Sequence, residues 1–310
     1  MKLLAAAAAL LALAGCAPRP LVPDASRLAP WTLALRDAQH DGPQVAVYRH
    51  RGQPLVVVGA VHENDVASPT FRLIGEAYGS YRFDAVLVEG VEHASGPDPA
   101  GLLAYVAASE PEGTFQPGGE TVPTVEGALR QRAAVWGGEP SDADVLTLAT
   151  ATATGVTAED VLGFYVLRVV PQWLREGEVE RPTDPGLRAL VEAELAAQRP
   201  RLGLGADVLP SYESWAGWYA RTNGRPLGGG FQTEEVGPLS DGPHGTNRVA
   251  YAVSRARDAF LLDRIAEHLG RGEAVLVVYG ASHLTILRPA LDALLGPPCH
   301  TGADLAGASC

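Results

Sequence analysis

The chain has 310 residues, of which 46% are hydrophobic and 19% charged, and its formal net charge is −12. A chain of this length can bury a large hydrophobic core without needing disulfides or metals to hold it together. The acidic balance argues against a nucleic-acid-binding surface, because such surfaces require clustered positive charge. The acidic residues are spread along the chain, so we interpret them as a contribution to solubility.

The first residues have the features of a targeting segment rather than of a folded element. Lys2 precedes an apolar stretch, residues 3–13, which is too short to span a bilayer. The stretch ends in Leu13-Ala14-Gly15-Cys16, which resembles the lipobox of bacterial lipoproteins. The resemblance implies a signal peptide over residues 1–15, cleavage before Cys16 and attachment of lipid to that cysteine.

The segment that follows is expected to be a tether. Residues 16–30 begin with the lipidated cysteine and are rich in proline, which favours an extended conformation. The lipobox resemblance further implies a protein of the bacterial cell envelope, anchored to the outer membrane and facing the periplasm. In such an oxidising compartment we predict a disulfide between the two remaining cysteines, Cys299 and Cys310. Residues 31–310 are predicted to form a single α/β domain.

The first half of the predicted sheet comes from a strand–helix–strand unit. An apolar run at residues 55–58 predicts a buried strand, and His62 follows it. Ser68, followed by proline, is typical of a helix start, and a second apolar run, residues 85–88, ends at Glu89. Such units have parallel strands joined by a right-handed crossover. The pattern therefore places Glu89 on the same sheet edge as His62.

Helical patterns replace the strand patterns in the middle of the chain. They follow one another between about residues 101 and 225, for example over 125–136 and 158–173. We therefore predict an α/β fold with a mixed, mainly parallel sheet flanked by helices. A large all-helical insertion at about 101–225 would separate the two sheet halves and pack over the sheet.

The second half of the sheet is predicted from the C-terminal part of the chain. A long helix is expected over residues 247–269, with Arg257 on its inward apolar stripe. An arginine in that position needs a carboxylate, a ligand or a route to water. A strand over residues 274–279 and then His283 follow, before a final helix over about 284–295, for which Ser282 is a candidate cap.

One short pattern occurs in both halves. Gly59-Ala60-Val61-His62 and Gly280-Ala281-Ser282-His283 each follow an apolar run. Ligands bind in parallel sheets beyond the carboxyl ends of the strands, where both histidines and Glu89 are predicted to converge. Two imidazoles and a carboxylate can hold a divalent metal such as Mn, Co or Zn and leave a position open for water. The same groups can also work without metal, with a histidine as general base oriented by the carboxylate.

These motifs, in this order, resemble the Tiki/TraB superfamily. Its wider relatives include the GumN-like proteins, the erythromycin esterases and the ChaN haem-uptake lipoproteins. In the Tiki branch, two Gly-x-x-His motifs and a glutamate are taken as the centre of a metal-dependent protease. The resemblance covers roughly residues 44–95 and 245–296. It implies His62, Glu89 and His283 as metal ligands and catalytic residues, with Arg257 as the matching arginine.

One position separates this chain from the other relatives. ChaN-like proteins and erythromycin esterases carry a glutamate in the first motif, where this chain has Ala60. The pattern is therefore nearer to that of the Tiki/TraB proteins, although the stretch after His62 is similar to that of ChaN.

The expected function is that of a membrane-tethered hydrolase acting on a peptide or another small carbonyl substrate. Water would attack the carbonyl at the His/Glu/His centre, and Arg257 would steady the developing oxyanion or a substrate carboxylate. Three further carboxylates are candidate accessory residues, namely Glu63, Glu92 and Glu139. The alternatives are a non-catalytic haem- or metal-binding lipoprotein resembling ChaN, and a metal-free esterase resembling erythromycin esterase.

Overall fold

The structure, a computed structural model, describes residues 20–93, 99–228 and 230–308. The predicted signal peptide, Cys16 and Cys310 lie outside these residues. Cys299 is disulfide-bonded, and its pairing with Cys310 stays a prediction. No helix in the described part of the chain combines the length and the apolar character needed to cross a bilayer.

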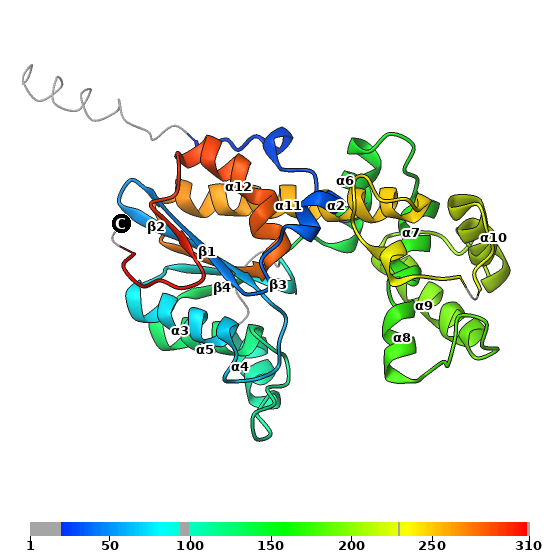
Figure 1. Cartoon of the computed structure of the whole chain (residues 1–310), viewed down its shortest axis with the longest axis horizontal. Helices are drawn as coiled ribbons and strands as arrows, with labels where there is room; N and C mark the ends of the chain where they lie inside the picture. The colour runs from blue at the N-terminus through cyan, green and yellow to red at the C-terminus, as the bar shows by residue number, and fades with distance from the viewer. Residues whose placement is uncertain (1–19, 94–98, 229, 309–310) are drawn as a thin grey trace, which may run out of the picture.

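A mixed six-stranded sheet forms the centre of the larger body (Figure 1). The strand order is β4-β3-β5-β2-β1-β6, in which β4, β3, β5 and β2 are parallel and β1 and β6 run antiparallel to their neighbours. The strands are β1 Gln44–His50, β2 Gln53–Ala60, β3 Ala85–Glu92, β4 Ala134–Glu139, β5 Val275–Gly280 and β6 His300–Gly302. The predicted α/β fold class is confirmed. Because β5 lies between β2 and β3, the two halves of the sequence interleave in the sheet.

Helices cover both faces of this sheet. One face carries α3 (Pro69–Ser80), α4 (Pro99–Ala108) and α5 (Thr121–Gln131), whereas α11 (Gly245–Gly270) and α12 (Ala281–Leu295) cover the other. The short elements η1 (Ala25–Arg27) and α2 (Leu33–Asp37) precede the sheet. Side chains alternate between the faces, so that Val56 and Val58 pack toward α3 while Val57 packs toward α11 and α12. Burial on both faces explains why the central strands are continuous apolar runs.

A second body, made of helices alone, lies beside the sheet in Figure 1. It has its own hydrophobic core, which includes Trp215 and Trp218, both almost fully buried. Its elements are α6 Asp142–Thr152, α7 Ala158–Leu167, α8 Val170–Glu176, α9 Leu187–Arg201, α10 Tyr212–Asn223 and η2 Thr233–Val236. The prediction that these helices pack over the sheet is wrong, because they bury their apolar side chains against one another and against α11.

Helix α11 joins the two bodies. Its first half contributes Val249 and Val253 to the helical core, and its second half contributes Leu261 and Ile265 to the core under the sheet. Arg257 lies between these two stretches, on the predicted inward stripe. The helix therefore positions Arg257 where the two bodies meet.

The expected helix over residues 125–136 is wrong in its second half. Helix α5 ends at Gln131, because Arg132 adopts a left-handed conformation with φ 60°. The following residues form the edge strand β4, which pairs in parallel with β3. A side chain at Gly137 would come within 2.3 Å of the Val91 carbonyl oxygen, so this pairing requires glycine. The all-helical part of the insertion consequently begins only at α6.

Candidate functional site

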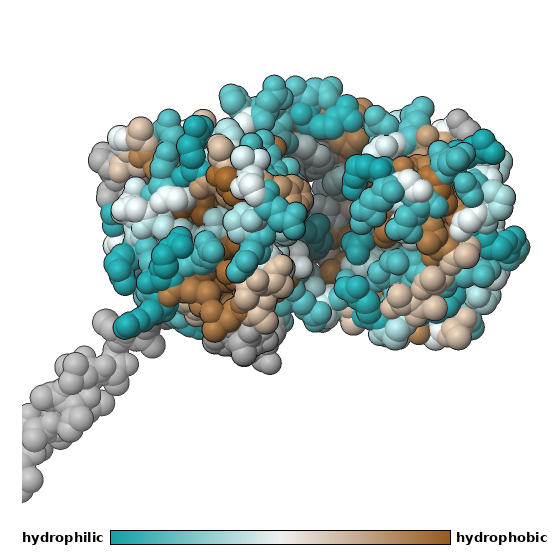
Figure 2. Space-filling model, turned by 90° about the horizontal axis from the view of Figure 1, so that it is seen from below, coloured by the Kyte–Doolittle hydropathy of each residue, from teal (hydrophilic) through white to brown (hydrophobic). Residues whose placement is uncertain are grey.

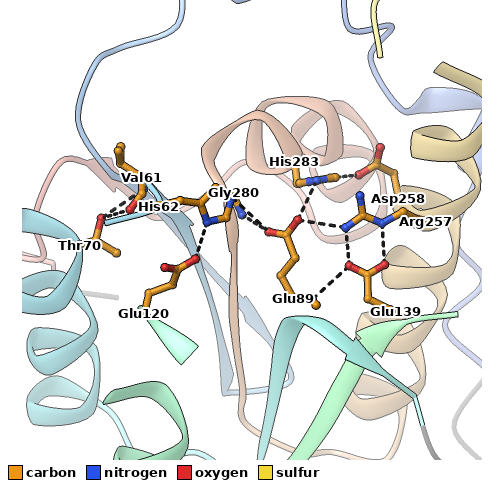
Figure 3. A network of polar contacts seen from close by, with 11 residues as sticks. Val61, His62, Thr70, Glu89, Glu120, Glu139, Arg257, Asp258, Gly280 and His283 are labelled. Atoms are coloured by element: carbon orange, nitrogen blue, oxygen red, sulfur yellow. Dashed lines mark hydrogen bonds and ion pairs between the residues drawn. The ribbon is translucent and has the colours of Figure 1, made fainter. Parts of the chain in front are cut away.

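The three predicted centre residues come together at the carboxyl edge of the sheet (Figure 3). His62 lies in the loop after β2, Glu89 lies in β3, and His283 lies in the first turn of α12. His283 Nε2 is 3.4 Å from Glu89 Oε1, and His62 Nε2 is 4.0 Å from Glu89 Oε2. The carboxylate of Glu89 therefore lies between the two imidazoles.

An irregularity in β3 presents Glu89 at this edge. Between the pairs formed by Val88 and Glu92, the register with β4 shifts, and Gly90 has φ +76°. Strand alternation places Glu89 on the same face as Leu87, toward α11 and α12. The backbone N–H of Gly280 donates to Glu89 Oε2 at 2.7 Å. Glu89 is thereby held from the neighbouring strand β5.

His283 is a buried residue of a helix, not the loop residue that the sequence predicted. Helix α12 starts at Ala281, directly after β5, so the expected start near residue 284 with Ser282 as cap is wrong. The ring of His283 is fixed by Asp258 of α11, whose Oδ1 is 2.5 Å from Nδ1. Burial alone would lower the pKa of His283, but the negative charges of Asp258 and Glu89 raise it to about 10. The two carboxylates therefore favour the imidazolium form of His283.

His62 is the exposed partner, with 64% of its side chain accessible to solvent. Its Nδ1 is 2.6 Å from Glu120 Oε1, and this hydrogen bond raises the pKa of His62. The preceding residue, Val61, is clamped by Thr70 of α3, which accepts a hydrogen bond from its N–H and donates one to its carbonyl. The clamp and Glu120 together orient the imidazole so that Nε2 faces Glu89 (Figure 3).

The two glycines of the repeated motif have different structural roles. A Cβ at Gly280 would lie 3.2 Å from His62 Nε2 and 3.4 Å from Glu89 Oε2, within the space that these side chains face. A Cβ at Gly59 would lie 3.0 Å from Ala281 Cα, where β2 packs against α12. Gly280 thus keeps the centre open, and Gly59 allows close backbone packing.

Arg257 reaches the centre together with the accessory candidate Glu139. Its Nη2 donates to Glu89 Oε1 at 3.0 Å, and its Nε and Nη2 donate to the two carboxylate oxygens of Glu139 at 2.6 and 2.5 Å. Burial would raise the pKa of Glu89, but His283 and Arg257 hold it well below its usual value. Arg257 therefore fixes Glu89 as an ionised carboxylate, and within the described residues its Nη1 remains without an ion pair or hydrogen bond.

The other accessory candidates lie at the margins of the centre. Glu63 follows His62, and its Oε2 is a buried atom without a hydrogen-bond partner among the described residues. Glu92 is exposed and lines a cavity beside Arg257. In the part of the chain that the structure describes, neither forms an ion pair with His62 or His283.

Sequence reasoning missed the two carboxylates that orient the imidazoles. The sequence pattern could have indicated Asp258, because it falls three residues before Leu261 and seven before Ile265 on a buried helix stripe. A carboxylate in that position needs a cationic partner. No sequence pattern indicates Glu120, because it lies in a loop before α5 and is brought to His62 only by the path of that loop.

The local charge of the centre is strongly negative. Four carboxylates, those of Glu89, Glu120, Glu139 and Asp258, surround a single permanent cation, the guanidinium of Arg257. With both imidazoles neutral, the count is four negative charges against one positive charge, or −3. Either protons on the histidines or a divalent cation would offset this excess. Within residues 20–93, 99–228 and 230–308, no three His, Cys, Asp or Glu side chains are already arranged to hold a metal ion.

A cavity of about 210 Å³ lies next to Arg257, between the two bodies. The space-filling view in Figure 2 shows the molecule hollowed between them. The walls of the cavity come from the ends of β3 and β4 and from α6, α7, α9 and α11. The lining residues are Gly90, Glu92, Glu139, Pro140, Asp142, Val145, Tyr165, Arg168, Arg201 and Arg257. The cavity borders the centre at Arg257 and Glu139, whereas His62, Glu89 and His283 are not among its lining residues.

Comparison of the chain with models of protein families, with curated proteins and with solved structures gives no match.

Proposed function

We propose that the protein is a membrane-tethered hydrolase of the Tiki/TraB type, with a divalent metal as its cofactor. In this proposal, water attacks the carbonyl of a peptide or small carbonyl substrate. The observation that carries the proposal is the orientation of His62 and His283. Each imidazole is held at Nδ1 by its own carboxylate, and each directs Nε2 toward Glu89. In metal sites, a ligating histidine almost always gives its second ring nitrogen to a carboxylate or carbonyl in this way.

The donor set fits Mn, Co or Zn. Two imidazole nitrogens and one carboxylate oxygen are suitable ligands, and ligand atoms around a tetrahedral ion with such bonds lie about 3.3 Å apart. The observed separations from Glu89 are 3.4 Å for His283 and 4.0 Å for His62. The longer separation belongs to the exposed loop residue, and the space that a Cβ of Gly280 would fill lies beside all three residues.

His62, Glu89 and His283 would hold this ion, which when bound lowers the pKa of water and polarises a carbonyl. Glu120 and Asp258 keep a proton on each Nδ1, so that Nε2 is the nitrogen that would bind the ion once its own proton is released. The Gly280 N–H and Arg257 hold the Glu89 carboxylate in place. Arg257 Nη1 is available to donate to negative charge that develops on the substrate oxygen.

A metal-free version of the same hydrolase is the second candidate, and the raised pKa of His283 favours it. Here His283 stays protonated beside Glu89. His62 Nε2 takes a proton from the attacking water, while Glu120 steadies the imidazolium that forms. This arrangement resembles the esterase alternative, and it requires no ion to offset the local negative charge.

The haem-binding alternative receives less support from the site. Haem requires an apolar slot beside its axial ligand. The cavity next to the centre is instead lined mainly by charged side chains, including Arg168, Arg201 and Glu92.

The proposal is tested by hydrolysis of a peptide and ester library by the purified protein, with and without added Mn, Co or Zn. His62→Ala and His283→Ala should abolish turnover, with folding checked by circular dichroism. His40→Ala is the matched control, because His40 is exposed and its ring accepts a hydrogen bond from the N–H of Gly42 in its own turn, away from the centre. Turnover in both centre variants would contradict the proposal. A Soret band on addition of haem, with no turnover of any substrate, would favour the haem alternative.

A further inference from the structure

One arginine in the wall of the cavity beside Arg257 forms no ion pair with a described residue. Of the three arginines in its walls, Arg257 is paired with Glu89 and Glu139, and Arg201 is paired with Asp142 at 2.7 Å. Arg168, which follows α7, forms no ion pair with any residue that the structure describes. A guanidinium left unpaired in the wall of a polar cavity is suited to bind an anion.

Arg168 is also held in a defined orientation. Its guanidinium carbon lies 3.9 Å from the centroid of the Tyr165 ring, so the guanidinium lies over the face of the aromatic ring. Tyr165 itself is 1% exposed and belongs to the helical core. Stacking on a fixed ring leaves the N–H groups at the edge of the guanidinium free to donate two parallel hydrogen bonds.

We propose that Arg168 binds a carboxylate of the substrate in this cavity, next to the hydrolytic centre. The inference rests on the proposed function and specifies its substrate class: a carbonyl compound with a carboxylate on the side of the scissile bond that faces α7. Arg257 is shared between the cavity and Glu89, so a substrate held by Arg168 lies against the residue that positions Glu89.

The acidic side chains of the cavity define which anion fits. Glu92, Glu139 and Asp142 line the same walls as Arg168. They repel a doubly charged phosphate more strongly than a singly charged carboxylate. A carboxylate also matches the forked geometry of one guanidinium, whereas a phosphate site of this size would need further unpaired cations.

The test is a binding measurement that does not depend on turnover. Isothermal titration of the purified protein with N-acetyl-dialanine and with its C-terminal amide compares a carboxylate with a neutral isostere. N-acetyl-glutamic acid amide and N-acetyl-glutamine amide provide the same comparison for a side-chain carboxylate. The wild type should bind at least one acid about tenfold or more tightly than its amide, and the preferred pair tells whether a chain terminus or an acidic side chain is bound.

Arg168→Ala should abolish this preference, and Arg168→Lys should retain only part of it, because lysine keeps the charge but not the fork. The matched control is Arg175→Ala, which removes an exposed arginine of α8 that does not line the cavity. Equal binding of acids and amides by the wild type would overturn the inference, as would a preference that survives in a folded Arg168→Ala.

Failure of the inference is distinguishable from failure of the proposed function. A His62→Ala/His283→Ala protein should lose turnover yet keep the preference for acids. A preference for acids without turnover in the wild type would contradict the proposed hydrolase activity but would still support the carboxylate site at Arg168. Turnover without acid preference would refute only the role of Arg168.

Discussion

Replacing Gly280 by alanine should impair metal binding and catalysis at the centre with little effect on the stability of the fold. Removing any of the charged residues would affect both. Gly280 has φ −51° and ψ 144°, which alanine adopts without strain. Alanine also reduces the entropy of the unfolded chain, which stabilises by about 0.4–1 kcal/mol and offsets part of the crowding in the folded state. The free energy of unfolding should therefore change by no more than about 1 kcal/mol.

The centre should respond very differently. The new methyl group would lie 3.2 Å from His62 Nε2 and 3.4 Å from Glu89 Oε2, so these side chains must move apart by a few tenths of an ångström. The methyl also fills the space that the donors face. We expect at least a tenfold loss of metal affinity, the order found when the surroundings of metal ligands are altered, and about a 100-fold loss of kcat/KM.

The assay pairs urea unfolding with titration of the metal and hydrolysis of the best substrate. Gly75→Ala is the control, because a Cβ at Gly75, in α3, meets no atom within 4 Å. A Gly280→Ala protein that folds, binds metal and hydrolyses substrate like the wild type would refute the placement of the centre.

Four further outcomes follow from the same contacts. Gly59→Ala should destabilise the fold by about 1–3 kcal/mol in urea unfolding, since its Cβ meets backbone; unchanged stability would contradict the packing. Asp258→Asn should cost about 3–5 kcal/mol in the same assay, because it removes the buried negative charge that faces His283 Nδ1; a cost below about 1 kcal/mol would contradict that pairing. Glu120→Gln should lower the pKa of His62 in an NMR titration, and an unchanged pKa would show that the contact is absent in solution. The pKa of His283 is about 10 in the folded protein and about 6.5 when unfolded, so the stability it contributes is complete below about pH 6.5. That contribution is lost as pH rises toward 10, and an unfolding free energy of the metal-free protein that stays constant from pH 7 to 10 would contradict the shift.

The sheet was predictable because its central strands are buried on both faces. The apolar runs before Gly59, Glu89 and Gly280 have no polar alternation, and only a parallel, doubly covered arrangement explains that pattern. Parallel strands then bring their carboxyl ends to one edge, which is why residues far apart in sequence could be expected to meet there.

The edge strand β4 was not predictable in the same way. Its apolar residues directly continue the pattern of α5, and the end of that helix depends on the left-handed conformation of Arg132, a residue type that rarely adopts it. These residues form a strand because they pair with β3, which is distant in the sequence. Local secondary-structure propensity does not reflect such a pairing.

The repeated motif also concealed a difference. Gly59 lies within β2 and His62 is an exposed loop residue, whereas Gly280 ends β5 and His283 enters α12 at once. The same four-residue spacing thus produces one solvent-facing and one buried imidazole. Their carboxylate partners come from a loop and from a helix packed by the fold, so the spacing alone did not indicate them.

The most direct test of the account is the metal content of the purified protein and of its His62→Ala/His283→Ala variant. Both are loaded with Mn, Co or Zn, desalted and measured by mass spectrometry. The account predicts about one ion per chain in the wild type and none in the folded variant, because both imidazoles would be ligands. Absence of metal from both proteins would contradict the metal centre and leave His62 with Glu120 as the catalytic base. Equal metal in both would show that the ion binds elsewhere.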